Sequence, residues 1–174
     1  VQLRYSGAVG AGTPVLSTAR SLSRGDQITS VRAILNGTTN FILWKMLEEG
    51  RPYAEALAEA QKLGYAETAP SADVNGLDTA TKVVILSSAL LNPDQEPATM
   101  RNVRIEGIRD IPASRLADAA TRGKVIKLIG SIRVGEGAAG GPLSLSVAPE
   151  EVDRHGPMDV PRNLNAVQFT TRRA

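Results

Sequence analysis

Apolar positions recur along the chain with two different spacings. In five segments they return every three or four residues, which lays them along one face of a helix. These segments are residues 14–23, 41–49, 53–63, 76–90 and 114–121. Short runs with alternating or continuous apolar character predict strands. Strands are expected at residues 1–5, 27–35, 101–108, 125–134, 143–147 and 167–171.

The same spacing predicts which residues two of the helices should bury. The first helix should turn inward Val15, Leu16, Ala19 and Leu22. The helix over residues 53–63 should turn inward Ala54, Leu57 and Ala58. Residues 149–154 are expected to form a single turn, and the helix over residues 41–49 should be capped by Thr39 or Asn40.

The order of these elements predicts the fold class. Helices and strands interleave in the first half of the chain, and strands dominate the second half. This order is typical of an α+β domain, with one mixed or antiparallel β-sheet and its helices packed on one face. A chain of 174 residues suits a single domain over residues 1–174 with a sizeable core.

Composition excludes several kinds of partner and site. The chain is 42% hydrophobic and 22% charged, with a net charge of +2 and scattered basic residues, so no footprint for nucleic acid is expected. There is no cysteine, which excludes disulfides and thiolate metal sites. No membrane-spanning run and no signal segment are visible, so a cytoplasmic protein without membrane contact is expected.

The densest candidate chemistry lies in residues 63–86. Three carboxylates, those of Glu67, Asp73 and Asp78, fall in a turn-rich segment that leads into an apolar helix carrying Lys82. Asp78 and Lys82 are four residues apart, so a helix places them one turn apart on one face. A surface ion pair is the plain alternative, and Asp73 or Asn75 could simply cap a helix. A lysine beside apolar packing is also a candidate acid–base group.

Two other stretches have a structural and a functional interpretation. The glycines of residues 7–12 resemble a dinucleotide loop, but the third glycine of that motif is missing. Thr13 and Pro14 instead suit a helix cap and a first helical position. Residues 36–40 include a glycine at the start of a predicted helix. Free backbone N–H groups there could bind an anion such as a carboxylate, or the segment could be a plain strand-to-helix turn. His155, the only histidine, is expected to be exposed and without a catalytic role.

Two of these segments resemble the signatures of the homoserine dehydrogenase family. One signature is carried by Gly64-Tyr65-Ala66-Glu67, Pro70, Asp73-Val74, Gly76-Leu77-Asp78 and Lys82. The other lies in residues 31–43, with Ile34-Leu35-Asn36-Gly37-Thr38-Thr39-Asn40 at its centre. The likeness continues more weakly through residues 123–129 and Asn165-Ala166-Val167, so it covers nearly the whole chain.

The resemblance implies reversible hydride transfer between NAD or NADP and aspartate 4-semialdehyde, giving L-homoserine, a step toward threonine, methionine and isoleucine. It implies that Lys82 donates the proton and that Asp78 orients Lys82. The residues implied to bind the substrate are Glu67, Asp73, Tyr65 through its backbone, Gly37 and Thr38. This chain has Ala69 where family members usually have aspartate, which removes one carboxylate.

The resemblance also implies partners and cofactors. Relatives carry a nucleotide-binding domain that the N- and C-terminal segments of this chain would join, so the chain alone should be inactive. A monovalent cation is implied at the backbone carbonyls of Val9, Ala11 and Thr13, although relatives usually have glutamate where Ser6 stands. A homodimer is implied. The alternatives are a non-catalytic amino-acid-binding module and a self-association module of the same descent.

Overall fold

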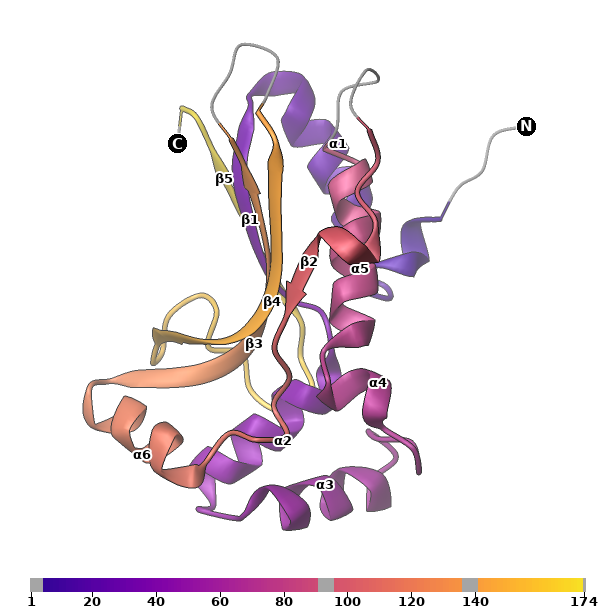
Figure 1. Cartoon of the computed structure of the whole chain (residues 1–174). Helices are drawn as coiled ribbons and strands as arrows, with labels where there is room; N and C mark the ends of the chain where they lie inside the picture. Colours follow the sequence, from indigo (N-terminus) through magenta and orange to yellow (C-terminus); the bar gives the residue numbers. More distant parts are fainter. Residues whose placement is uncertain (1–4, 91–95, 136–140, 174) are drawn as a thin grey trace.

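A computed structural model describes residues 5–90, 96–135 and 141–173, and Figure 1 shows their arrangement. The strand predicted over residues 1–5 lies outside the described residues except for Tyr5, which is not in a strand. The sequence also predicts loops over residues 92–99 and 135–142, and part of each lies outside the described residues.

Five strands form one sheet with the order β2-β4-β3-β1-β5. All neighbours are antiparallel except β2 and β4, which are parallel. The sheet is therefore mixed, as expected. The strands are β1 (Ile28–Ile34), β2 (Val103–Ile105), β3 (Lys124–Val134), β4 (Leu143–Asp153) and β5 (Ala166–Thr171).

The helices gather on one side of this sheet (Figure 1). Some of them stand beside the strands, and the others lie at the end where β3 and β4 bend. Among the described residues, the α-helices are α1 (Val15–Gly25), α2 (Gly37–Glu48), α3 (Tyr53–Lys62), α4 (Ser71–Val74), α5 (Leu77–Ser88) and α6 (Ala113–Thr121). Short 3₁₀ turns occur at η1 (Ser6–Ala8) and η2 (Met100–Asn102). None of the helices in the described part of the chain is long and apolar enough to span a bilayer.

The helix-facing side of the sheet forms the main core. Val31 on β1 lies opposite Ile132 on β3, which lies opposite Leu145 on β4, and all three are buried. Two residues before Ile132 on β3, Gly130 allows α5 to approach the sheet closely. A Cβ atom at Gly130 would lie 2.6 Å from Cγ2 of Val83, so only glycine fits there without a shift of α5.

A smaller core lies on the opposite side of the sheet, where residues 154–165 cross it. Its buried members are Ile34, Val125, Ile129, Val152 and Met158. Lys127 is also buried in this region, and its Nζ donates a hydrogen bond of 2.7 Å to the carbonyl of Val160. Burial lowers the pKa of the Lys127 ammonium, and the carboxylates of Asp159 and Glu48 offset part of that effect.

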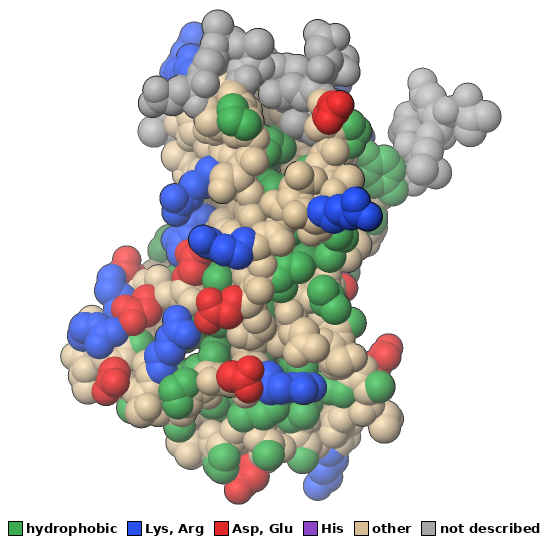
Figure 2. All heavy atoms as spheres, viewed as in Figure 1, with side chains coloured by type: hydrophobic (Ala, Val, Ile, Leu, Met, Phe, Trp, Pro, Cys, Tyr) green, Lys and Arg blue, Asp and Glu red, His purple; other side chains and the backbone are tan. Residues whose placement is uncertain are grey.

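On the face of the molecule seen in Figure 2, acidic and basic side chains are interspersed rather than separated. The described residues include exposed ion pairs between elements, such as Arg122 with Glu151 and Arg115 with Glu106. Exposed pairs of this kind contribute little to stability.

Two sequence predictions about strand lengths were wrong. Residues 149–154 do not form a separate turn, because β4 continues along β3 to the pair of Lys124 and Asp153. Pro149 is tolerated there because β2 pairs with β4 only as far as Val147, so β4 borders no second strand at the proline. The strand predicted over residues 101–108 is only three residues long, because β2 pairs with β4 only from Leu145 to Val147.

Helix details also differ from the prediction. Leu22 of α1 is 36% exposed rather than buried. In α3 the exposed alanines are Ala54 and Ala58, whereas Ala56 and Ala60 are buried. An alanine-rich helix carries little information on which face is inward, because alanine occurs on both faces. Helix α1 begins at Val15 with Pro14 in the cap position, and no side chain caps it.

Candidate active site

The junction between β1 and α2 forms one wall of the candidate site. Asn36 follows β1 and caps α2, because its Oδ1 accepts a hydrogen bond of 2.9 Å from the backbone N–H of Thr39. The helix therefore begins at Gly37, earlier than expected, and the predicted caps Thr39 and Asn40 lie inside its first turn.

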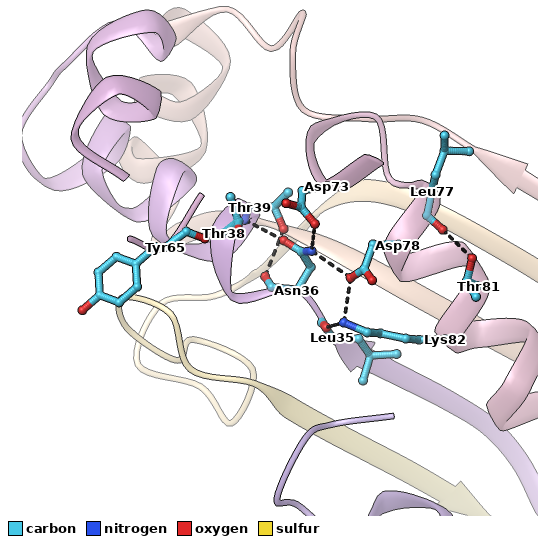
Figure 3. Close-up of polar contacts among 10 residues, drawn as sticks. All are labelled: Leu35, Asn36, Thr38, Thr39, Tyr65, Asp73, Leu77, Asp78, Thr81 and Lys82. Atoms are coloured by element: carbon cyan, nitrogen blue, oxygen red, sulfur yellow. Dashed lines mark hydrogen bonds and ion pairs between the residues drawn. The ribbon is translucent and has the colours of Figure 1, made fainter. Parts of the chain in front are cut away.

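A sharp turn between α4 and α5 forms the opposite wall. Gly76 adopts a left-handed conformation with φ of 81°, which glycine reaches without steric cost. The turn brings Asp73 at the end of α4 and Asp78 at the start of α5 toward the same amide. Nδ2 of Asn36 donates hydrogen bonds of 2.7 Å to Asp73 Oδ1 and 2.8 Å to Asp78 Oδ2 (Figure 3).

Lys82 lies one turn further along α5 and points into the same cluster (Figure 3). Its Nζ donates a hydrogen bond of 2.6 Å to Asp78 Oδ2 and one of 2.8 Å to the carbonyl of Leu35. The Lys82 side chain is 25% exposed and that of Asp78 is 31% exposed. The carbonyl of Leu35, just after β1, thus also holds the lysine of this pair, unlike in a solvated surface ion pair.

These groups border one open cavity with a volume of about 380 Å³. Its lining comprises Asn36, Gly37, Thr38, Gly64, Tyr65, Asp73, Asp78, Lys82 and Asn163. All the residues predicted to be catalytic or to bind substrate are in this set except Glu67. A cavity that joins two carboxylates, an ammonium and exposed backbone suits a small zwitterion such as an amino acid.

Tyr65 contacts the start of α2 through its backbone. Its carbonyl accepts a hydrogen bond from Oγ1 of Thr38. Its ring points away from the carboxylates (Figure 3) and packs 4.9 Å from the ring of Phe41, centre to centre. The side chain of Glu67 is exposed, and the backbone carbonyl of this residue accepts a hydrogen bond from Gln61.

Three residues of the cavity lining were not anticipated as site residues: Asn36, Gly64 and Asn163. Asn36 joins the carboxylates to α2, and Asn163 lies against Gly37, where an added Cβ would meet the Asn163 carbonyl oxygen at 2.8 Å. Asn36 was visible inside a signature, but its partners are 37 and 42 residues away in sequence. Asn163 carries no local signal that would reveal its approach to Gly37.

The backbone atoms expected to face a cation lie in a different place. Val9 is buried, Ala11 has a left-handed φ of 51°, and the carbonyl of Thr13 accepts the N–H of Val15 at 2.8 Å. Thr13 borders a second cavity of about 210 Å³, between this loop and the beginning of β5, which Asn165 also lines. Within the described ranges, no group of three or more His, Cys, Asp or Glu side chains could hold a metal.

His155 is exposed, as predicted, and has a left-handed φ of 63°. Its backbone N–H donates a hydrogen bond of 2.9 Å to Oδ2 of Asp159. His155 is not among the residues that line the cavity.

Comparison with known proteins places this chain in a family of oxidoreductases. The model of the homoserine dehydrogenase family matches residues 14–174, and the chain therefore belongs to the homoserine dehydrogenase family. A homoserine dehydrogenase of Methanocaldococcus jannaschii is 40% identical over 171 residues, which are 98% of this chain and 48% of the relative.

Two further relatives give the same result. The NAD(+)-dependent homoserine dehydrogenase of Pseudomonas canavaninivorans is 39% identical over 98% of this chain and 47% of its own length. A solved homoserine dehydrogenase from Thiobacillus denitrificans superposes with a TM-score of 0.88 at 31% identity, over 98% of this chain and 38% of that one. The chain thus spans about half, or less, of the length of these relatives.

Proposed function

We propose that this chain is the substrate-binding and catalytic portion of a homoserine dehydrogenase, which interconverts L-aspartate 4-semialdehyde and L-homoserine. The observation that carries the proposal is the convergence of Asp73, Asp78 and Lys82 on one cavity beside the start of α2. Such an enzyme would serve the synthesis of threonine, methionine and isoleucine, in the cytoplasm.

Substrate binding follows from the charges around the cavity. The substrate ammonium would be held by a carboxylate and a carbonyl, for which Asp73 and the backbone of Tyr65 are suitably placed. Glu67 is proposed as a second carboxylate because of its place in the family signature, although its side chain lies outside the cavity lining. Gly37 and Thr38 present the backbone at the start of α2, which favours a carboxylate.

The proton transfer is proposed for Lys82. When the aldehyde carbon receives a hydride, its oxygen gains a negative charge and needs a proton to become the hydroxyl of homoserine. Lys82 Nζ would donate that proton, and in the reverse direction it would accept it. Asp78, at 2.6 Å, would orient Lys82 and balance its charge.

A nicotinamide cofactor would supply and accept the hydride. One relative is named as NAD(+)-dependent, and either NAD or NADP is proposed here. The loop over residues 7–12 lacks the glycine pattern of a dinucleotide site, so we propose that the cofactor is held by a nucleotide-binding domain that both ends of this chain join. On this account the isolated chain binds substrate but does not turn it over.

Two further features belong to the proposal. A monovalent cation could be held by the carbonyls of Val9, Ala11 and Thr13; the left-handed backbone at Ala11 suits the sharp curvature that such a site needs. A homodimer is proposed through an exposed edge of the sheet. Light scattering that shows only monomers at high protein concentration would contradict the dimer.

The test is a spectrophotometric assay of a complete enzyme carrying this chain, with L-homoserine and either NAD⁺ or NADP⁺. Formation of the reduced cofactor is expected, and no turnover with either cofactor would contradict the proposal. Calorimetry on the isolated chain separates the alternatives. Heat on addition of homoserine should fall in a Glu67→Ala variant, and equal heats would remove Glu67 from the site. Binding in the chain without turnover in the complete enzyme would favour the amino-acid-binding module.

A further inference from the structure

We propose that Asn36 is a positioning residue of this site, whose amide holds Asp73 and Asp78 together and fixes Asp78 beneath Lys82. The inference rests on the proposed function for its consequence in catalysis. Asn36 is 6% exposed, and its amide contacts three different elements of the fold.

The hydrogen-bonding capacity of the amide is matched to its surroundings. A side-chain amide has two N–H donors and one acceptor oxygen. Both donors of Nδ2 are used by carboxylates, those of Asp73 and Asp78, and the oxygen is used by Thr39 N–H. The opposite orientation of the amide would direct its oxygen at two carboxylates, so the network fixes the orientation.

The amide leaves acceptors for a ligand. Within the described part of the chain, the side-chain hydrogen bonds of these carboxylates use Oδ1 of Asp73 and Oδ2 of Asp78. The second oxygen of each remains for an ammonium in the cavity. Two carboxylates this close would repel one another, and a neutral donor between them lowers that repulsion without occupying the cation site.

The position of Asn36 in sequence links the two walls of the cavity. Leu35, the preceding residue, accepts a hydrogen bond from Lys82, while the Asn36 side chain bonds to Asp78. One dipeptide therefore contacts both partners of the ion pair. The next residues, Gly37 and Thr38, line the cavity. A shift of Asn36 would therefore displace Lys82 and these lining residues together.

Three substitutions separate capping from positioning. Asn36→Ser keeps an oxygen for Thr39 N–H but cannot reach the carboxylates. Asn36→Asp keeps the shape and the cap but replaces two donors with a third carboxylate. Asn36→Ala removes both functions. The matched control is Asn102→Ser, at an exposed asparagine before β2 whose side chain bonds to Thr99 and does not line the cavity.

In a complete enzyme, Asn36→Ser should lower kcat by about tenfold and Asn36→Asp by about a hundredfold, because small misplacements of catalytic groups are costly. Both should also change the pH profile of kcat/KM, which a cap alone would not do. Asn102→Ser should leave both unchanged. Values of kcat and KM within about twofold of wild type for both Asn36 variants, with an unchanged profile, would overturn the inference.

A second measurement does not depend on activity. Hydrogen exchange on the isolated chain should quicken in Asn36→Ser over residues 71–78, while the first turn of α2 stays protected. Unchanged exchange over residues 71–78 would overturn the inference even if the enzyme is active. Absence of turnover in the wild-type enzyme would instead contradict the proposed function, and the exchange result would still decide the role of Asn36.

Discussion

The ammonium of Lys82 lies 2.8 Å from the carbonyl oxygen of Leu35, a residue 47 positions earlier in the chain. This contact connects α5 to the end of β1, so the ion pair between Lys82 and Asp78 does not depend on α5 alone. A pair on one helix turn is worth a few tenths of a kcal/mol when it is solvated. Here the lysine is also held by the backbone beside the cavity, which suits a group that must deliver a proton to a fixed point.

A methyl group added at Gly37 should disturb the cavity where Gly37 meets Asn163. Its Cβ would lie 2.8 Å from the carbonyl oxygen of Asn163, so the loop around Asn163 must move away from the cavity. We expect Gly37→Ala to weaken homoserine binding at least about tenfold, since displacement of positioning groups is costly. Calorimetry on the isolated chain measures this directly.

Gly25→Ala is the matched control, because a Cβ at Gly25 would meet nothing within 4 Å. Homoserine affinity of Gly37→Ala equal to that of this control would show that the approach of Asn163 has no part in binding.

A larger side chain at Gly130 should destabilise the main core. A Cβ there would lie 2.6 Å from Val83 and 3.2 Å from the methyl carbon of Thr79, both on α5. Overpacking of this kind typically costs about 1–3 kcal/mol, so Gly130→Ala should lower the free energy of unfolding by that amount. Denaturant unfolding of the variant and wild type measures the difference, and a variant as stable as wild type would contradict the close packing of α5 on β3.

The buried Lys127 should make stability depend on pH. Its pKa is lowered in the folded state by burial, whereas the unfolded chain keeps the ordinary value of 10.5. Between these two values the unfolded state binds more protons, so the free energy of unfolding contributed by Lys127 rises with pH. Below the folded-state pKa this contribution is lost, because the charged form must be buried.

A Lys127→Met variant should lack this rise. The quantity to measure is the difference in free energy of unfolding between variant and wild type across the alkaline range, with Lys62→Met, at an exposed lysine, as control. A difference that stays constant with pH would show that Lys127 has the same pKa in both states.

Local patterns predicted much of this fold, and tertiary contacts determined the rest. Spacing of apolar residues located β1, β3, α2 and α5, because each buries a face that its own sequence specifies. The pair of Asp78 and Lys82 could be predicted because a single helix turn relates them. The pairing of Asn36 with Asp73 could not, because it depends on how the α4–α5 turn meets the end of β1. The length of β4 was missed because only its pairing with β3 makes residues 149–153 extended.

The central claim is that Lys82 transfers the proton, and kcat of a Lys82→Ala variant of a complete enzyme tests it most directly. We predict a loss of kcat of at least about a hundredfold, within the range for removal of a general acid, with an unchanged circular dichroism spectrum. Lys62→Ala, at an exposed lysine at the end of α3, should keep wild-type activity. Turnover by Lys82→Ala at more than about 5% of wild type would contradict the account.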